Sequence, residues 1–199
     1  MRKTMTYLKL WFTAYINPCK FADELAISPA PSWGFFAALQ RGLMDSLLIY
    51  LPMCLLRRVP PTRSYLSFIP DEKYYGALLI LGPIVLLAEW LLSSSLMHLI
   101  LRLGKRFSDI DKVLNISGFS ALAIGSVLIL WDALWLLTGG MNQYSLGVSH
   151  LLIDLWAIAI ATIALKRILK VPIWLGILLN IIGIIVSMPL AIMFMRSPL

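Results

Sequence analysis

Residues His98–Ser120 read HLILRLGKRFSDIDKVLNISGFS and form a short basic turn between two long apolar runs. The apolar run before the turn ends at Arg102, and the next one begins near Val113. Four basic side chains mark the turn itself: Arg102, Lys105, Arg106 and Lys112. A charged turn between runs of about 20 apolar residues is typical of a loop that joins two membrane-spanning helices. This stretch therefore predicts a chain that crosses a bilayer more than once.

The composition of the whole chain favours the same class of protein. Of its 199 residues, 60% are hydrophobic and only 14% are charged, and the mean hydropathy is +0.85. A soluble domain carries considerably more charge. The net charge of +7 raises the question of nucleic-acid binding, but the basic residues lie at the ends of apolar runs rather than in one patch. We expect a single all-α, polytopic membrane bundle with no nucleic-acid partner.

Five apolar segments are each near the length of about 20 residues that a helix needs to cross the hydrocarbon core. They cover residues 33–55, 75–101, 113–137, 146–165 and 172–195. Together they define a predicted transmembrane domain over residues 33–195. Residues 1–32 are predicted to form a cytoplasmic N-terminal segment, in which residues 4–16 make an amphipathic helix that lies in the membrane interface.

The basic residues between these segments predict the orientation of the chain. If the N-terminus is inside, the larger group of Lys and Arg residues lies on the cytoplasmic side, as membrane proteins prefer. That group is Arg2, Lys3, Lys9, Lys20, Arg102, Lys105, Arg106, Lys112, Lys166, Arg167 and Lys170, and the outer group is Arg57, Arg58, Arg63, Lys73 and Arg196. We therefore expect the N-terminus in and the C-terminus out.

One acidic residue lies in each of the first four predicted spans: Asp45, Glu89, Asp132 and Asp154. An ionisable side chain inside a bilayer costs a few kcal/mol, so each of them is a functional candidate. Helical spacing places each acid on the same stripe as small residues of its span, and small residues let membrane helices approach closely. The spacing therefore predicts that all four acids face the interior of the bundle.

The sharper interpretation of these acids is a cation site. His150 and Asp154 are four residues apart, so both can reach one ion, with Asp132 and Glu89 completing the site. The short loop between the third and fourth spans makes those spans antiparallel neighbours and puts Asp132 and Asp154 at similar depth. Imidazole and carboxylate groups suit divalent metals, and a proton relay through the same groups is a variant.

The same residues also fit a structural role. Arg41 and Asp45 are four residues apart, which predicts an ion pair within one helix. Asp132, His150 and Asp154 can instead hydrogen-bond across a helix pair, or be protonated where they are buried. The sequence shows no nucleophile elbow and no Gly-rich phosphate loop. We expect no enzymatic activity, and no cofactor other than a divalent cation if the first interpretation holds.

Two motifs and the layout of spans carry a family resemblance over about residues 15–195. They are NPCKFADEL (17–25) before the first span, and RLGKRFSDIDKVLNISGFS (102–120). On these features the chain resembles the Yip family, the Ypt/Rab-interacting membrane proteins, in its short prokaryotic branch. Gly118, Phe119 and Ser120 stand where the family has a Gly-Tyr-Ser-like element, although no Pro follows here before Asp132. The resemblance implies an α-helical integral membrane protein of a bacterial inner membrane, with no known enzymatic activity.

Two functions stay open at this stage. The first is a non-enzymatic membrane scaffold or adaptor whose partners are the lipid bilayer and either another membrane protein or further copies of the chain. The second is a transporter of small cations, such as divalent metals, or of protons, which would use Asp132, His150, Asp154 and Glu89. The first predicts that loss of the acids lowers stability, and the second that it abolishes ion binding while the fold survives.

Overall fold

The computed structural model describes residues 6–27, 32–60, 68–138 and 143–194, and over these ranges the chain is helical and without β-strands. Two short helices come first, α1 (Tyr7–Ile16) and α2 (Pro18–Ile27). Three consecutive helical segments follow, α3 (Trp33–Asp45), the π-helix η1 (Ser46–Tyr50) and α4 (Leu51–Leu55). After a 3-10 turn, η2 (Asp71–Lys73), come α5 (Tyr74–Leu103), α6 (Ile110–Thr138), α7 (Gln143–Leu169) and α8 (Ile173–Phe194).

Four of the helices in these ranges, α5 to α8, are each long and apolar enough to cross a membrane. They correspond within a few residues to the second to fifth predicted spans. The chain is therefore an all-helical protein with the features of an integral membrane protein. The basic residues Arg2, Lys3, Arg63 and Arg196 lie outside the described residues, as does the start of the predicted 4–16 helix.

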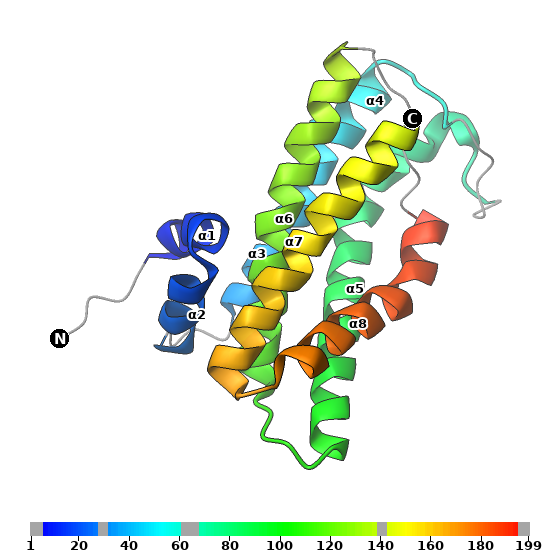
Figure 1. Cartoon of the computed structure of the whole chain (residues 1–199). Helices are drawn as coiled ribbons and strands as arrows, with labels where there is room; N and C mark the ends of the chain where they lie inside the picture. The colour runs from blue at the N-terminus through cyan, green and yellow to red at the C-terminus, as the bar shows by residue number, and fades with distance from the viewer. Residues whose placement is uncertain (1–5, 28–31, 61–67, 139–142, 195–199) are drawn as a thin grey trace.

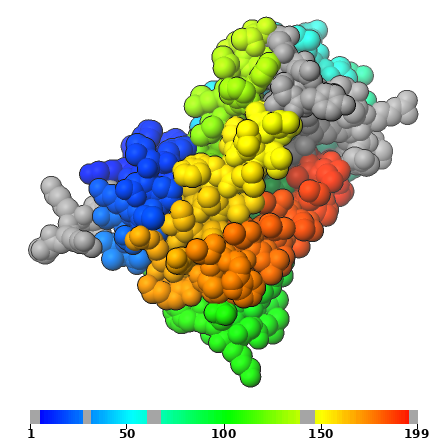
Figure 2. All heavy atoms as spheres, viewed as in Figure 1, coloured from blue at the N-terminus to red at the C-terminus, as the bar shows by residue number. Residues whose placement is uncertain are grey.

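Helix α6 is the central helix of the bundle. In its most apolar part 67% of the residues are buried, compared with 17% to 28% in α5, α7 and α8. It packs against α3, α5 and α7, while α8 runs obliquely across α5 after leaving the end of α7 (Figure 1). Figure 2 shows α7 and α8 at the surface over much of the viewed face. The interior of the bundle is thus organised around α6, and α7 and α8 keep a large outer surface.

The first predicted span, residues 33–55, is helical throughout but is not one regular α-helix. In the π-helical turn the N–H of Leu51 donates to the carbonyl of Ser46, five residues earlier. Pro52 explains the irregularity, because its ring lacks an N–H and clashes with the carbonyl four residues earlier. The wider turn before Pro52 relieves that clash. Of the three segments, α3 and η1 run alongside α6, whereas α4 contacts α5 (Figure 1).

Two glycines bring α3 and α6 into backbone contact. A Cβ atom added to Gly34 would collide with the backbone of Leu114, and one added to Gly118 with the backbone of Gly34. At this crossing Asn115 of α6 also caps α3, since its Oδ1 accepts the Gly34 N–H at 2.6 Å. The first N–H groups of a helix have no partner within the helix. Asn115 therefore satisfies one of them from a neighbouring helix.

Small residues make other helix crossings possible, as their spacing predicts. A Cβ at Gly176 of α8 would lie 3.0 Å from Cγ2 of Thr162 in α7. A Cβ at Gly183 would lie 2.9 Å from Cε of Met97 in α5. Lipid tails are as apolar as helix side chains, so the hydrophobic effect does not drive helices together in a bilayer. Helices associate there through close packing of this kind.

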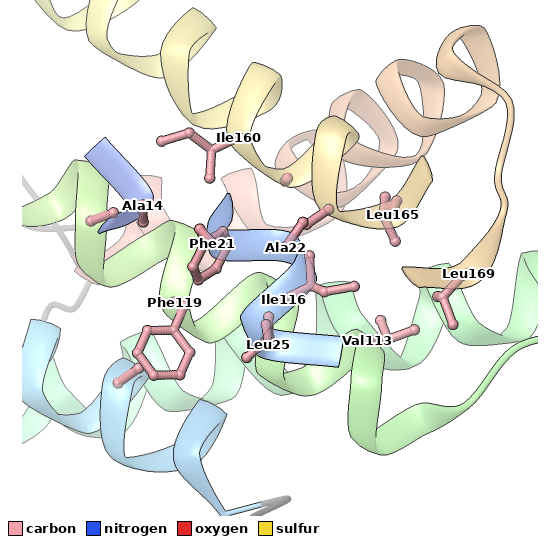
Figure 3. Close-up of a cluster of buried hydrophobic side chains, with 14 of the residues drawn as sticks. Ala14, Phe21, Ala22, Leu25, Val113, Ile116, Phe119, Ile160, Leu165 and Leu169 are labelled. Atoms are coloured by element: carbon pink, nitrogen blue, oxygen red, sulfur yellow. The ribbon is translucent and has the colours of Figure 1, made fainter. Parts of the chain in front are cut away.

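Helices α1 and α2 form a hairpin that packs on α6 and α7. Leu10 and Ala14 of α1, and Phe21, Ala22 and Leu25 of α2, are fully buried there. Figure 3 shows the α2 side chains of this cluster among those of α6 and α7. The opposite side of α1 leaves apolar side chains exposed, among them Leu8 and Phe12. The predicted position of this helix in the membrane interface stays a prediction.

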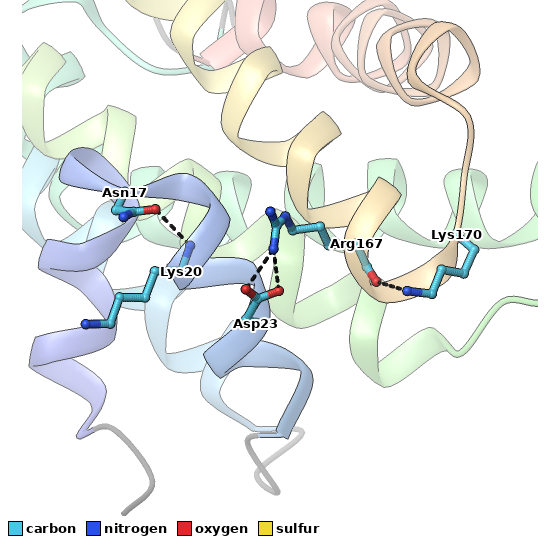
Figure 4. A network of polar contacts seen from close by, with 5 residues as sticks. All are labelled: Asn17, Lys20, Asp23, Arg167 and Lys170. Atoms are coloured by element: carbon cyan, nitrogen blue, oxygen red, sulfur yellow. Dashed lines mark hydrogen bonds and ion pairs between the residues drawn. The ribbon is translucent and has the colours of Figure 1, made fainter. Parts of the chain in front are cut away.

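Polar contacts also hold the α1–α2 hairpin against α6 and α7. Both carboxylate oxygens of Asp23 accept bonds from Nη1 of Arg167, at 2.7 and 2.8 Å (Figure 4). The Oδ1 of Asn17 accepts the backbone N–H of Lys20 and so caps the start of α2. Lys112, from the predicted basic turn, donates through Nζ to the carbonyl of Ala26 at 2.9 Å. These contacts join α2 to both α6 and α7.

Candidate functional site

Ionisable side chains from four helices of the bundle, α3, α5, α6 and α7, make up the candidate site. They are Arg41 and Asp45 of α3, Glu89 of α5, Asp132 of α6, and His150 and Asp154 of α7. We call this set the polar cluster. It contains every residue that the sequence analysis assigned to a cation site or to an internal ion pair.

Arg41 and Asp45 form an ion pair within α3. The Asp45 residue is buried, and the Arg41 side chain is only 14% exposed. Gly125 of α6 makes room for the arginine, because a Cβ atom there would collide with its guanidinium and Cδ. Leaving either partner of a buried pair without the other costs several kcal/mol. The pair therefore links the integrity of α3 to its packing against α6.

Glu89 approaches this pair from α5. The Asp45 carboxylate and the Arg41 guanidinium are both close enough to interact electrostatically with it. Its Oε1 is buried, and no hydrogen bond reaches that atom from the part of the chain that the structure describes. A buried carboxylate oxygen without a hydrogen bond costs free energy. Glu89 therefore differs from the paired members of the cluster, because no direct partner explains why a carboxyl group is there.

Asp132 and His150 join α6 to α7. The Nε2 of His150 lies 2.7 Å from Oδ1 of Asp132, and this nitrogen donates when it carries the proton. The preceding residue on each helix makes a parallel contact, since Nε1 of Trp131 donates to Oγ of Ser149 at 2.8 Å. Two adjacent polar bonds therefore fasten the end of α6 to the beginning of α7.

The expectation that Asp154 faces the bundle interior was wrong. Asp154 is an exposed residue of α7. The buried positions of α7, such as Ile160, Ala164 and Leu165, lie nearer its other end, where the helix meets its neighbours on more sides. On a helix that touches protein along a narrow strip, a residue at the edge of the strip becomes exposed. His150 and Arg41 are nevertheless close enough to Asp154 to interact with it electrostatically.

The predicted metal ligands are not assembled into a metal site in this structure. His150 and Asp132 touch each other. Across the described ranges, no three His, Cys, Asp or Glu side chains form a group that could hold a metal ion. A divalent metal site needs several such ligands at one point. The cluster instead contains two direct pairs, Arg41 with Asp45 and Asp132 with His150.

The predicted basic turn divides into two parts. Arg102, Lys105 and Arg106 are exposed, whereas Lys112 is engaged with α2. The turn is closed at its base by Nδ1 of His98, which lies 2.8 Å from Oγ of Ser108. Lys105 has a φ of 55°, a left-handed conformation that helps end α5 at Leu103, with Gly104 as its C-cap.

An apolar groove between α1 and α3 was not found by sequence reasoning. It has a volume of about 450 Å³ and is lined by Tyr7, Trp33, Phe36, Leu39, Gln40 and Leu43. Two of its polar groups bond each other, because Tyr7 Oη donates to Oε1 of Gln40 at 3.0 Å. No local pattern reveals that residues 33 positions apart meet in this way.

Comparisons with protein-family models, curated proteins and solved structures give no match to this chain. The resemblance to the Yip family therefore stays a prediction from the motifs at 17–25 and 102–120.

Proposed function

We propose that this chain is a non-enzymatic integral membrane protein of the Yip type that acts as a scaffold or adaptor in a bacterial inner membrane. The observation that carries the proposal is the pairing of intramembrane charges with each other. Arg41 bonds Asp45, and Asp132 bonds His150. Polar side chains that bond within and between spans stabilise a membrane bundle, so these residues have a role without a ligand.

The proposed topology has five spans, with the N-terminus in and the C-terminus out. Residues 33–55 supply the additional span, because 23 helical residues at about 1.5 Å each reach about 34 Å, enough to cross the hydrocarbon core. The Arg41–Asp45 pair lowers the cost of placing two charges in that span. The excess of Lys and Arg on the proposed cytoplasmic side supports the orientation.

The experiment is a combined measurement of stability and ion binding on detergent-purified protein. Wild type is compared with Asp132→Ala, His150→Ala, Asp154→Ala and the double variant Asp132→Ala/Asp154→Ala by thermal unfolding and elemental analysis. The proposal expects no stoichiometric divalent metal in the wild type and a lower unfolding temperature for Asp132→Ala and His150→Ala. A near-stoichiometric metal that disappears in folded variants would contradict it.

A second function, proton or small-cation transport, is favoured by Glu89. Its buried Oε1 lacks a donor among the described residues, as a proton-carrying or ion-binding group would. The cluster also holds four carboxyl groups against Arg41 and His150, so protons or a bound cation are needed to neutralise it. Proteoliposomes with an internal pH dye separate the two functions. Transport predicts a flux that Glu89→Gln abolishes, whereas the scaffold predicts equal, background flux in both proteins.

A further inference from the structure

The outer face of α7 carries a carboxylate where lipid contact alone would favour apolar groups. Leu151, Leu152 and Leu155 are 60%, 62% and 53% exposed, as expected of side chains that contact lipid tails. Asp154 is exposed among them. It lies 11 residues after Gln143, the first residue of α7, which at about 1.5 Å per residue is about 16 Å into a helix of membrane-spanning length. His150 and Arg41 of its own chain interact with Asp154 electrostatically. A carboxylate at this depth also requires a hydrogen-bonding partner or a proton.

The same face has an open approach for another helix. Gly147, Leu151, Asp154 and Ile158 follow one another at spacings of four, three and four residues, so they share one stripe of α7. A Cβ atom at Gly147 would meet no atom of the described residues within 4 Å, so this glycine does not serve packing among them. A glycine on an open membrane-helix face lets a second helix come close. Figure 2 shows α7 at the surface, with no other described segment over its viewed side.

The group that complements Asp154 is on the same helix. His150 precedes it by one turn, and its side chain is 33% exposed. Because its Nε2 bonds Asp132, Nδ1 is the ring nitrogen that can bond an atom outside that pair. Two copies inserted in the same orientation are related by a two-fold axis along the membrane normal, so their α7 helices pack side by side with equal residues at equal depth. Each Asp154 then lies within one turn of the His150 of the other copy.

We propose that two copies of this chain form a homodimer through the outer stripe of α7, with Asp154 and His150 of each copy at the interface. The inference rests on the proposed scaffold function and names its partner as a second copy. A lipid cannot offer a bond to Asp154 at this depth, since acyl chains have no donor. A second copy brings the Nδ1 of its His150 to each Asp154. This nitrogen donates to the carboxylate when the ring is the imidazolium and accepts the proton of a protonated carboxyl when it is neutral, and the pairing hides both groups from the bilayer.

The test is disulfide crosslinking in liposomes at high lipid-to-protein ratio. In a Cys19→Ser/Cys54→Ser background, Leu151→Cys places a single thiol on the proposed interface. Ile84→Cys is the matched control, since Ile84 is 56% exposed on α5 and is replaced by the same thiol. The dimer predicts a covalent pair with Leu151→Cys and monomer with Ile84→Cys. Equal yields at the two positions would overturn the proposal.

Two further changes separate the interface from folding. Asp154→Ala added to Leu151→Cys is expected to reduce the crosslinked fraction by several-fold to tenfold, while Asp154→Asn, which still hydrogen-bonds, retains most of it. Gly147→Leu fills space that is open in the single chain and is expected to reduce the fraction as well. An unchanged yield in both Asp154→Ala and Gly147→Leu would overturn the proposal. If the protein is monomeric and binds no metal, the dimer is rejected and the scaffold function is not. If a dimer takes up metal, the scaffold function is rejected and the dimer is not.

Discussion

The side chain of Arg41 occupies the space that a side chain at Gly125 would need. The contact lies between α3 and α6, and it brings the guanidinium to Asp45 while leaving its side chain only 14% exposed. The glycine is therefore required by a charged group of a neighbouring helix rather than by its own backbone, whose φ is not positive. This relationship makes α6 part of the binding site for the only arginine within residues 33–55.

Gly125→Ala tests this relationship directly. The added methyl group must push Arg41 away from its position, so we expect a loss of about 1–3 kcal/mol in the free energy of unfolding, as overpacked interiors show. Gly76→Ala is the matched control, because a Cβ atom there would lie at an ordinary contact distance of 3.6 Å from Sγ of Cys54. Reversible unfolding in mixed micelles measures both. Equal stability of the two variants would show that Arg41 moves without cost.

The bond between Asp132 and His150 should appear as a coupling energy. Polar pairs between membrane helices contribute about 0.6 kcal/mol on average and up to about 1.7 kcal/mol. We expect a value in this range from a double-mutant cycle with Asp132→Ala, His150→Ala and the double variant, measured by unfolding in micelles. The same cycle on Asp154 and His150 is the comparison. A larger coupling for Asp154 than for Asp132 would contradict the observed pairing.

Asn115→Ala should weaken the start of α3. Its Oδ1 accepts the Gly34 N–H at 2.6 Å, and Ser32, at the usual capping position, makes no side-chain bond to the helix. Removing a cap costs about 0.5–2 kcal/mol, and the loss here leaves a buried N–H group unpaired. Hydrogen exchange of the amides at the start of α3 would rise relative to those in the middle of α6. Unchanged exchange would argue against capping by Asn115.

Tyr7→Phe should change how stability depends on pH. Burial raises the pKa of Tyr7 from 10.0 to about 12. A raised pKa means that the unfolded chain loses this proton first, so stability present below about pH 10 is lost as the pH rises toward about 12. Tyr7→Phe also removes the bond to Gln40, which costs about 1 kcal/mol at neutral pH.

The measurement for Tyr7 is the unfolding midpoint between about pH 8 and about pH 12 in wild type and Tyr7→Phe. We expect the difference between the two proteins to shrink with rising pH, because only the wild type has this phenol to ionise. Tyr15→Phe is the control, since it removes a phenol from the same helix. Parallel curves for wild type and Tyr7→Phe would contradict the expectation.

Much of the fold follows from local sequence. The apolar runs predicted the long helices within a few residues, and the glycine stripes predicted which faces pack, as Gly34 with Gly118 shows. The break before Pro52 was not predicted as a π-helical turn, since the way a helix absorbs a proline depends on its neighbours. The cap by Asn115 and the groove beside Tyr7 were missed, because each joins residues far apart in the sequence.

The candidate site separates most clearly what the local sequence determines from what the packing of the helices decides. Hydropathy and helical period act over one or two turns, so the chain's local pattern already determined where the long apolar helices lie and which residues share a helix face. Whether a face meets protein or lipid depends on where the other helices pack. That packing paired His150 with Asp132 and left Asp154 on the outside, four residues further along α7. A difference of about 40° around a helix is too small for periodicity to resolve, but it separates an interior contact from an exposed carboxylate.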